Sequence, residues 1–399
     1  MKALVLSGGG SKGSYQVGVW KALRELNIKF DIVTGTSVGA LNGAMIVQND
    51  YRKAVSIWKK INLKVLFGED AIESTNNFEI YKMYSKHFLK YGGMNVRDLE
   101  KLIRKSLNLR RFYNSKINYG LTAYNLTSKE AIELQKKDIE RSQLDDYLMA
   151  SASCFPAFKK KDIEGEKHID GGYHDNLPIN LALDMGADEI IAVDLNAPGL
   201  KKSPKKKVKI TYIKPRNKLT NFLNFYEKGT ESNMKFGYND TMKTFGKFEG
   251  NKYTFRKNQL EKNRLLYQET YLHVLNKILK YKKVIKSFEE LINTNITIED
   301  ETKDEIFEKL MLKIMESTAK SFKLDETRVY THHSFNKLLQ IELKKYLKDE
   351  IETNEPCKKK EIELYKLIKE SEYQELRKQA LLNPIDTLKA IYIYTICEA

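Results

Sequence analysis

The chain has 399 residues and a mass of 46.4 kDa, enough for two or three domains, and its 41% hydrophobic content excludes a disordered tail. Basic residues outnumber acidic ones by 69 to 53. The net charge of +16 excludes an acidic solvating protein. It suggests that the binding partner is nucleic acid or a membrane surface. Three scattered cysteines exclude a disulfide framework, and no run approaches the roughly 20 apolar residues of a spanning helix. We therefore expect a cytoplasmic protein, with peripheral contact to a membrane left open.

Nearly all of the excess charge lies in one block. Residues 201–282 hold 21 basic and 6 acidic residues, a net charge of +15. The block opens at 201–207 with Lys-Lys-Ser-Pro-Lys-Lys-Lys, which is typical of a linker or an exposed loop. Glycine is common before this point and sparse in the last third of the chain. We therefore predict a domain of residues 1–200 and a lysine-rich, mainly helical region of residues 201–399.

The first half of the chain alternates strands with helices. Short apolar runs predict buried strands at 3–6 and 31–34, and helical spacing of apolar residues follows each one, around Tyr15 to Leu26 and over 38–48. Further on, alternating patterns predict paired strands at 118–126 and 131–134, and an apolar run predicts a buried strand at 189–195. This order is typical of a layered α/β domain with parallel strand pairing.

After residue 220 the apolar residues recur at helical spacing. Such stripes are usually the core-facing sides of packed helices. Three stripes stand out: Leu275, Ile278, Leu279, Ile285, Phe288 and Ile292; Ile306, Phe307, Leu310, Met311, Ile314 and Met315; and Leu338, Leu339, Tyr346 and Leu347.

A glycine-rich loop, residues 8–13 (Gly-Gly-Gly-Ser-Lys-Gly), lies between the first strand and the first helix. Consecutive glycines and a helix N-terminus leave backbone N–H groups free, which favours an anion site. The loop matches a dinucleotide-binding pattern, but the only nearby acid, Asp31, precedes the second strand instead of following it. A P-loop is excluded because Ser14 follows Gly13. An oxyanion hole and a plain tight turn remain as the other two interpretations.

A candidate nucleophile follows the second strand. Gly35-Thr36-Ser37-Val38-Gly39 is a G-x-S-x-G pattern in the strand–turn–helix context that a nucleophile elbow requires. The flanking Gly35 and Gly39 allow the strand and the helix to approach closely while Ser37 projects from a sharp turn. The alternative is a turn with an incidental serine.

A serine nucleophile needs a base to take its proton. His168 and His174 are the plausible partners for a Ser-Asp-His triad. Between them, Asp170 is followed by Gly171 and Gly172, and a carboxylate at this strand end could act on the serine directly. An ordinary Asp has a pKa of about 3.9, so such a base requires a partly desolvated site.

Taken together, the glycine loop, the Ser37 pattern and Asp170-Gly171-Gly172 resemble the patatin-like phospholipase family in order and spacing. Two flanking segments agree: the small-residue stretch 150–156, which ends in proline, and Asp175-Asn176-Leu177-Pro178. Lys12 stands where the family often has arginine. The resemblance covers roughly residues 1–200 and says nothing of the second half.

The resemblance implies a three-layer α/β/α sandwich around a mostly parallel sheet. It implies a Ser-Asp dyad in which Ser37 attacks an ester carbonyl, Asp170 accepts its proton, and an acyl-enzyme forms. The loop of Gly8, Gly9, Gly10, Lys12 and Gly13 would hold the oxyanion, with no metal or cofactor. The substrates would be membrane lipids, cleaved as by a phospholipase A or lysophospholipase. His168, His174 and Cys154 would then have no catalytic role.

Other functions remain open from the sequence. The same dyad could serve an acyltransferase or a thioesterase. The block 201–282 interleaves aromatic and basic residues, as at Tyr253, Phe255 and Arg256, which suits single-stranded nucleic acid in principle. It equally suits an anionic membrane or a plain solvated face. Since the first half resembles a lipid hydrolase, we expect a membrane contact and no nucleic acid. The sequence predicts neither the head-group preference nor the oligomeric state.

Overall fold

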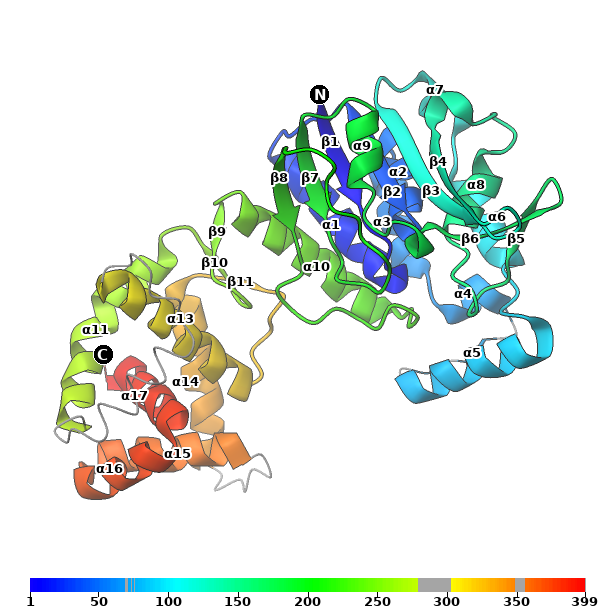
Figure 1. Cartoon of the computed structure of the whole chain (residues 1–399). Helices are drawn as coiled ribbons and strands as arrows, with labels where there is room; N and C mark the ends of the chain where they lie inside the picture. Colours follow the sequence, from blue (N-terminus) through cyan, green and yellow to red (C-terminus); the bar gives the residue numbers. More distant parts are fainter. Residues whose placement is uncertain (69–70, 73, 75, 279–302, 349–355, 399) are drawn as a thin grey trace. The chain divides into compact units, whose positions relative to one another are not determined.

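The structure is a computed structural model that describes residues 1–399 except 69–70, 73, 75, 279–302, 349–355 and 399, without the side chains of 303–307, 348 and 356–358. The chain divides into two compact units, Met1–Thr244 and Phe245–Ala399. Each unit has its own secondary structure (Figure 1) and is described by itself.

The first unit is built on an eight-stranded sheet whose order is β5-β6-β3-β2-β1-β7-β8, with β4 paired to β3. Strands β3, β2, β1, β7 and β8 are parallel, and β4, β5 and β6 are antiparallel to their neighbours. The expected mostly parallel α/β fold is therefore confirmed. The strands are β1 Lys2–Leu6, β2 Ile32–Thr36, β3 Asn118–Asn125, β4 Glu130–Gln135, β5 Lys161–Ile163, β6 Glu166–Asp170, β7 Glu189–Val193 and β8 Lys209–Ile213.

Helices cover both faces of this sheet. Alternate residues of a strand point to opposite faces, so Val5 and Leu6 face different layers. Val5 belongs to a core cluster with Ile179 and Leu183 of α9, whereas Leu6 lies against Gly43 of α2. The unit thus has three layers. Its helices are α1 Ser14–Glu25, α2 Val38–Val47, α3 Tyr51–Lys60, α4 Leu63–Phe67, α5 Asn77–Tyr91, α6 Arg97–Ser106, α7 Leu109–Asn114, α8 Leu144–Ser151, α9 Ile179–Asp184 and α10 Glu227–Thr244, with short 3-10 turns at Gly10–Gly13, Lys136–Asp138 and Gly171–Tyr173.

Strand β3 brings the ends of two other strands together. Strand β4 pairs with β3 over residues 120–125 and so occupies one of its two edges. Strands β2 and β6 must therefore share the other edge. Strand β2 runs parallel to β3 and ends with Thr36 opposite Thr122, whereas β6 runs antiparallel and ends with Asp170 opposite Ala123. The carboxyl ends of β2 and β6 consequently meet head to head.

The first compact unit extends past the boundary that we predict near residue 200. The lysine-rich segment 201–207 is an exposed loop, as expected, but it leads into β8, which joins the main sheet beside β7. Helix α10 then packs closely on α1. A side chain at Gly237 would place its Cβ 2.0 Å from the carbonyl oxygen of Tyr15, and one at Gly18 would lie 1.9 Å from that of Met234. Gly18 of α1 and Gly237 of α10 thus allow the helix of residues 227–244 to pack directly against the α/β domain.

The second unit is mainly helical, as predicted. Its core gathers the expected stripes, including Ile278, Leu310, Met315 and Leu339. Leu279, Ile285, Phe288 and Ile292, and the side chains of Ile306 and Phe307, lie outside the described residues. The elements are α11 Gln259–Ile278, α13 Lys303–Ser321, α14 His332–Lys348, α15 Pro356–Lys369, α16 Tyr373–Leu382 and α17 Pro384–Glu398, with a small sheet of β9 Phe248–Glu249, β10 Thr254–Arg256 and β11 Val329–Tyr330.

Two aromatic side chains that the sequence singles out in the basic block, Tyr253 and Phe255, are part of this second core. Tyr253 and Phe255 are buried, and the ring of Phe255 lies 4.9 Å from that of Phe335. A base can stack only on an accessible ring, so these two side chains are not available to nucleic acid. At these two positions, the aromatic residues that suggest nucleic-acid binding in the sequence are packed in the core of the structure.

The close approach of α10 to α1 leads to a stability prediction. Gly237→Ala should lower the free energy of unfolding of the first unit by about 2–3 kcal/mol, because the added methyl group must push the two helix backbones apart. Both tryptophans, Trp20 and Trp58, belong to this unit, so their fluorescence during urea unfolding reports on it alone.

The matched control is Lys235→Ala, an exposed position on the same helix, which should change the free energy of unfolding by less than about 0.5 kcal/mol. A Gly237→Ala protein as stable as the parent would refute the close packing of these two helices.

Candidate active site

A large apolar cavity opens in the first unit beside the head-to-head strand ends. Its volume is about 980 Å³, at the upper end of the range of small-molecule pockets. Side chains from α2, α3, α5, α6 and α8 line it, together with the loops 195–200 and 222–225. Ser37 and Asp170 both lie in its wall, so the structure brings together the two residues on which the sequence argument depends.

Ser37 occupies a strained turn between β2 and α2. Its φ of 56° and ψ of −128° lie outside the regions that L-residues ordinarily adopt. The turn is tight because a Cβ on Gly39 would lie 2.3 Å from the carbonyl oxygen of Leu6. A Cβ on Gly35 would lie 2.4 Å from the backbone of Gly39. The hydroxyl of Ser151 accepts a hydrogen bond from the N–H of Ser37 at 2.8 Å and helps to fix this conformation.

Asp170 ends β6 with its carboxyl group buried; the residue is only 7% exposed. The N–H of Gly172 donates to its Oδ1 at 2.8 Å, and its own N–H donates to the carbonyl of Ser153 at 3.0 Å. Burial raises the pKa of the Asp170 carboxyl to about 6, against hydrogen bonding from the Ser37 side chain and the Gly172 N–H, which lowers it. The site thus supplies the desolvation that an aspartate base requires.

The glycine loop lies beside Ser37, since a Cβ on Gly8 would lie 3.1 Å from the Cβ of Ser37. Gly9 and Gly10 line the cavity, and within the part of the chain that the structure describes their N–H groups have no hydrogen-bond partner. Gly10 has a φ of +55°, and a Cβ there would lie 2.0 Å from the carbonyl oxygen of Phe222. The N–H of Gly8, by contrast, donates to the carbonyl of Asn176 at 3.1 Å. Two of the predicted donors are therefore free to meet an anion.

Comparison with known proteins identifies the domain that carries this geometry. The model of the family described as patatin-like phospholipase matches residues 4–183. These residues belong to the patatin-like phospholipase family. The predicted resemblance is thereby confirmed, and the match contains every residue of the glycine loop, the Ser37 turn and the Asp170 strand end.

Named proteins of several organisms match about half of the chain. A lysophospholipase nte1 of Aspergillus terreus is 29% identical over 200 residues, which are 49% of this chain and 12% of that protein. Human patatin-like phospholipase domain-containing protein 6 is 29% identical over 204 residues, 49% of this chain and 13% of that protein. The matched segment thus spans about an eighth of the length of these relatives.

Among solved structures, VipD from Legionella pneumophila aligns over 99% of this chain and 90% of its own, with a TM-score of 0.42 and 15% identity. The type III effector protein ExoU aligns over 99% and 77%, with a TM-score of 0.34 and 11% identity. At these TM-scores and identities, neither alignment assigns a relative to the second unit.

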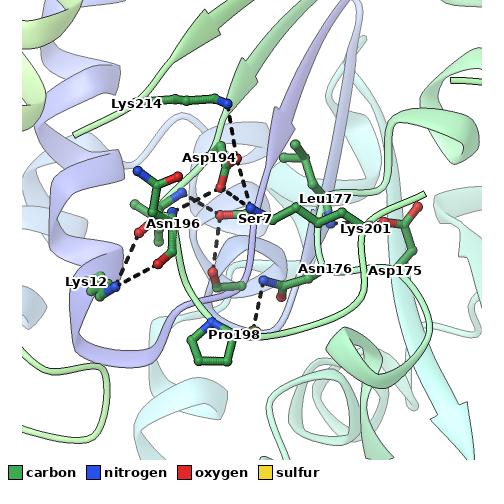
Figure 2. A network of polar contacts seen from close by, with 12 residues as sticks. Ser7, Lys12, Asp175, Asn176, Leu177, Asp194, Asn196, Pro198, Lys201 and Lys214 are labelled. Carbon is green, nitrogen blue, oxygen red and sulfur yellow. Dashed lines mark hydrogen bonds and ion pairs between the residues drawn. The ribbon is translucent and has the colours of Figure 1, made fainter. Parts of the chain in front are cut away.

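Two further members of the predicted oxyanion loop have structural contacts in the patatin-like domain. The ammonium group of Lys12 donates to the carbonyls of Asn196 (3.1 Å) and Leu195 (3.4 Å), as Figure 2 shows, and burial lowers its pKa. Gly13, the last residue of the 3-10 turn that precedes α1, packs against Val38 and Trp58. Lys12 therefore fastens the glycine loop to the loop after β7.

That second loop is itself held by a buried carboxylate. Asp194 at the end of β7 forms an ion pair with Lys201 at 2.7 Å and a longer one with Lys214 at 3.7 Å (Figure 2). Between Asp194 and Lys201 the chain crosses the cavity wall, and the N–H of Leu200 donates to the carbonyl of Gly172 at 2.9 Å. Part of the lysine-rich segment is thus used to position this wall.

The histidines and the cysteine near the site have other contacts. The ring of His174 contacts Glu133 at 3.3 Å and Lys202, and His168 is buried with its Nδ1 3.0 Å from the carbonyl of Glu166. Neither is among the described residues that line the cavity. Cys154 does line it, but burial raises the pKa of its thiol to about 12, which keeps it in the unreactive thiol form.

Sequence reasoning missed part of the cavity wall. Residues 217–225 follow the predicted boundary, yet Ser11 donates from its N–H to the carbonyl of Phe222 (2.9 Å) and from its hydroxyl to that of Asn221 (2.8 Å). No motif marks this segment. Ser151, which accepts the hydrogen bond from the Ser37 N–H, does lie in the small-residue stretch 150–156. That stretch could therefore have indicated a residue that supports the Ser37 turn.

No metal site accompanies these groups in the part of the chain that the structure describes: no three His, Cys, Asp or Glu side chains gather to hold an ion there. The expectation that the chemistry requires no metal or cofactor stays a prediction. In the same residues no helix is both long enough and apolar enough to cross a membrane.

The raised pKa of Asp170 leads to a stability prediction. The folded carboxyl has a pKa of about 6 and the unfolded one about 3.9, so the stability that its proton contributes is present at low pH and lost as the pH rises through about 6. Relative to the parent, Asp170→Asn should therefore gain about 1.4 kcal/mol in the free energy of unfolding between about pH 5 and about pH 8.

Urea unfolding followed by tryptophan fluorescence at several pH values measures this difference. Asp188→Asn is the control, because the N-terminal amine lowers the pKa of the exposed Asp188 carboxyl, so this group stays ionised from about pH 5 to about pH 8 and its difference from the parent should hardly vary with pH. A difference between Asp170→Asn and the parent that does not vary with pH would contradict the prediction.

Proposed function

We propose that the patatin-like domain hydrolyses fatty-acyl esters of membrane lipids, as a phospholipase A or lysophospholipase does. One observation carries the proposal: Ser37 on a strained turn and the buried Asp170 share the wall of an apolar cavity of about 980 Å³. The names of the Aspergillus and human relatives, lysophospholipase and patatin-like phospholipase, support the same substrate class. The whole protein's activity and substrates are part of this proposal.

In the acylation step, Ser37 Oγ bonds to the ester carbonyl carbon and its proton moves to the Asp170 carboxylate. The carbonyl π electrons move to the oxygen, and the N–H groups of Gly9 and Gly10 stabilise the resulting oxyanion. When the oxyanion collapses, the bond to the alcohol oxygen breaks. Asp170 returns the proton to that oxygen, which releases the lyso-lipid or glycerol compound and leaves the acyl group on Ser37.

In the deacylation step, water takes the place of the serine. Its oxygen bonds to the acyl carbon while Asp170 accepts one proton, and a second oxyanion forms against the same N–H groups. The bond to Ser37 Oγ then breaks, the proton passes from Asp170 to Oγ, and a fatty acid leaves. Every proton that moves is thus held by one carboxyl group, whose pKa of about 6 keeps it ionised but usefully basic at neutral pH.

The cavity accounts for the acyl part of the substrate. Its lining is mostly aliphatic and aromatic, with side chains such as Leu41, Met45, Trp58, Leu102 and Phe225. Transfer of a methylene group from water into such a lining contributes about 0.8 kcal/mol. We therefore expect the acyl chain to lie in the cavity and the polar head group to remain outside it.

An acyltransferase or a thioesterase would use the same two residues, with another acceptor or another leaving group. Mass spectrometry of the products formed from a natural lipid extract separates these possibilities. Free fatty acid with lyso-lipid indicates hydrolysis, whereas a new acylated species in place of free fatty acid indicates transfer. The Ser37→Ala protein provides the background.

The dyad leads to a prediction about activity. Ser37→Ala and Asp170→Asn should each lower kcat/KM for an acyl ester by at least about 1,000-fold, because the first removes the nucleophile and the second removes its base. His174→Ala should leave the rate within a few fold of the parent. Hydrolysis of a phospholipid and of a short soluble acyl ester measures both effects. Full activity in Ser37→Ala would refute the dyad, and loss in His174→Ala with Asp170→Asn spared would indicate a triad.

The base also sets the pH dependence. Since Asp170 must be ionised to accept the serine proton, kcat/KM should fall about tenfold per pH unit below about pH 6. Asp175 is a useful control because burial also raises the pKa of its carboxyl to about 6. Asp175→Asn should keep the same acid limb, provided that its thermal unfolding shows a folded domain. A limb that disappears in this variant would assign the titration to Asp175 instead.

A further inference from the structure

Helix α5, coloured cyan in Figure 1, carries several exposed apolar side chains on its outer surface. One side of the helix is anchored by the buried residues Ile80, Met83 and Tyr84. Phe78 is 70% exposed and Leu89 is 84% exposed. Exposed apolar patches of this kind mark sites at which a domain binds a membrane, another protein or an apolar ligand. The α5 face, as we define it, consists of the exposed side chains Phe78, Tyr81, Phe88, Leu89 and Tyr91.

Lysines alternate with these apolar side chains. Lys82, Lys86 and Lys90 are all exposed, and Glu79 is the only acidic residue of the helix. The helix therefore presents aromatic and aliphatic groups flanked by positive charge. A basic amphipathic helix with this composition is typical of helices that lie in the plane of a membrane interface.

The α5 face is continuous with the cavity. Tyr81, Phe88 and Leu89 are exposed and at the same time line the cavity that holds Ser37 and Asp170. The helix is fixed over the cavity on its inner side, where the hydroxyl of Tyr84 donates to the carbonyl of Leu223 at 3.2 Å. The ring of Phe88 also packs edge-on against Phe155 at 5.5 Å. A lipid that leaves a bilayer at this helix would pass from one apolar surface directly into another.

In the described part of the basic block 201–282, several lysines are paired with carboxylates of the protein itself. Lys201 is paired with Asp194, Lys205 with Asp184, and the buried Lys243 with Asp240. The described part of the block is also divided between the two units at Thr244. Part of its charge is therefore matched within the protein, whereas on α5 the exposed lysines accompany exposed apolar side chains.

We propose that the α5 face is the surface by which this chain binds anionic phospholipid membranes, with the mouth of the cavity turned toward the bilayer. This inference rests on the proposed lipid hydrolase function, because it explains how a water-insoluble acyl ester reaches Ser37. Apolar side chains of α5 enter the interface, and Lys82, Lys86 and Lys90 bind the anionic head groups.

The test measures binding to vesicles of phosphatidylcholine with and without phosphatidylglycerol, by sedimentation, with the full chain carrying Ser37→Ala so that the vesicles stay intact. In this background, Phe78→Ser with Lys82→Gln and Lys86→Gln should weaken binding to the anionic vesicles by at least roughly 25-fold, since each lysine near such a surface contributes about 1 kcal/mol. None of the three side chains lines the cavity.

The matched control makes the same kinds of change elsewhere on the first unit: Tyr212→Ser with Lys206→Gln and Lys207→Gln, all three exposed. It should bind vesicles as the parent does. Equal loss in both variants would show that total charge, and not α5, governs binding, and would overturn the proposal. Absence of binding by the parent would also overturn it and would leave a protein partner as the occupant of α5.

A second measurement does not depend on the triple variant folding well. Phe78→Trp keeps an aromatic side chain, and Trp20 and Trp58 are buried, so the added emission comes from α5. It should shift to the blue on addition of anionic vesicles and be quenched by brominated lipid; an unchanged spectrum would contradict insertion.

Hydrolysis of a soluble short-chain ester, measured with proteins that retain Ser37, separates the proposed hydrolase function from the proposed membrane binding by the α5 face. A parent that binds vesicles but cleaves no ester disproves only the proposed function. A parent that cleaves the ester but does not bind vesicles disproves only the α5 face.

Discussion

The site depends on how closely β2 and α2 approach each other at Ser37. With φ at 56° the serine is held in a conformation that the surrounding structure must enforce. Backbone contacts enforce it, because positions 35 and 39 leave no room for a Cβ and the Ser151 hydroxyl accepts the Ser37 N–H. The serine side chain is thereby directed into the cavity, and the glycine loop and Asp170 are arranged around that fixed point.

Asp170 illustrates the balance between stability and chemistry at such a point. A carboxylate with a pKa near 6 destabilises the folded state at neutral pH relative to its protonated form. The same burial makes it a stronger base than a solvated aspartate. The domain therefore gives up part of its folding free energy at the position where proton transfer is proposed, and the Gly172 N–H limits that loss by hydrogen bonding to the charged oxygen.

Local sequence patterns were sufficient to predict much of the fold of the first unit. The strands around Leu4 and Val33 and the paired strands at 118–126 and 131–134 were predictable because apolar runs and alternation are local properties. Strand β5 and the edge strand β8 were not predicted, and a short polar sequence such as 161–163 becomes a strand only through its neighbours. Likewise, Ser37 and Asp170 could be identified because each lies in a recognisable motif. The contact of Ser11 with Phe222 could not be predicted, because no local sequence pattern links two segments so far apart in the chain.

The head-to-head meeting of β2 and β6 on β3 has a consequence for how this domain tolerates changes in length. The relative position of Ser37 and Asp170 is set by the hydrogen-bond ladder of β3 and not by the chain between them. Loops within that intervening segment can therefore lengthen or shorten without moving the pair. A single residue inserted into β6 would instead turn its side chains to the opposite face of the sheet and remove the carboxylate from the serine.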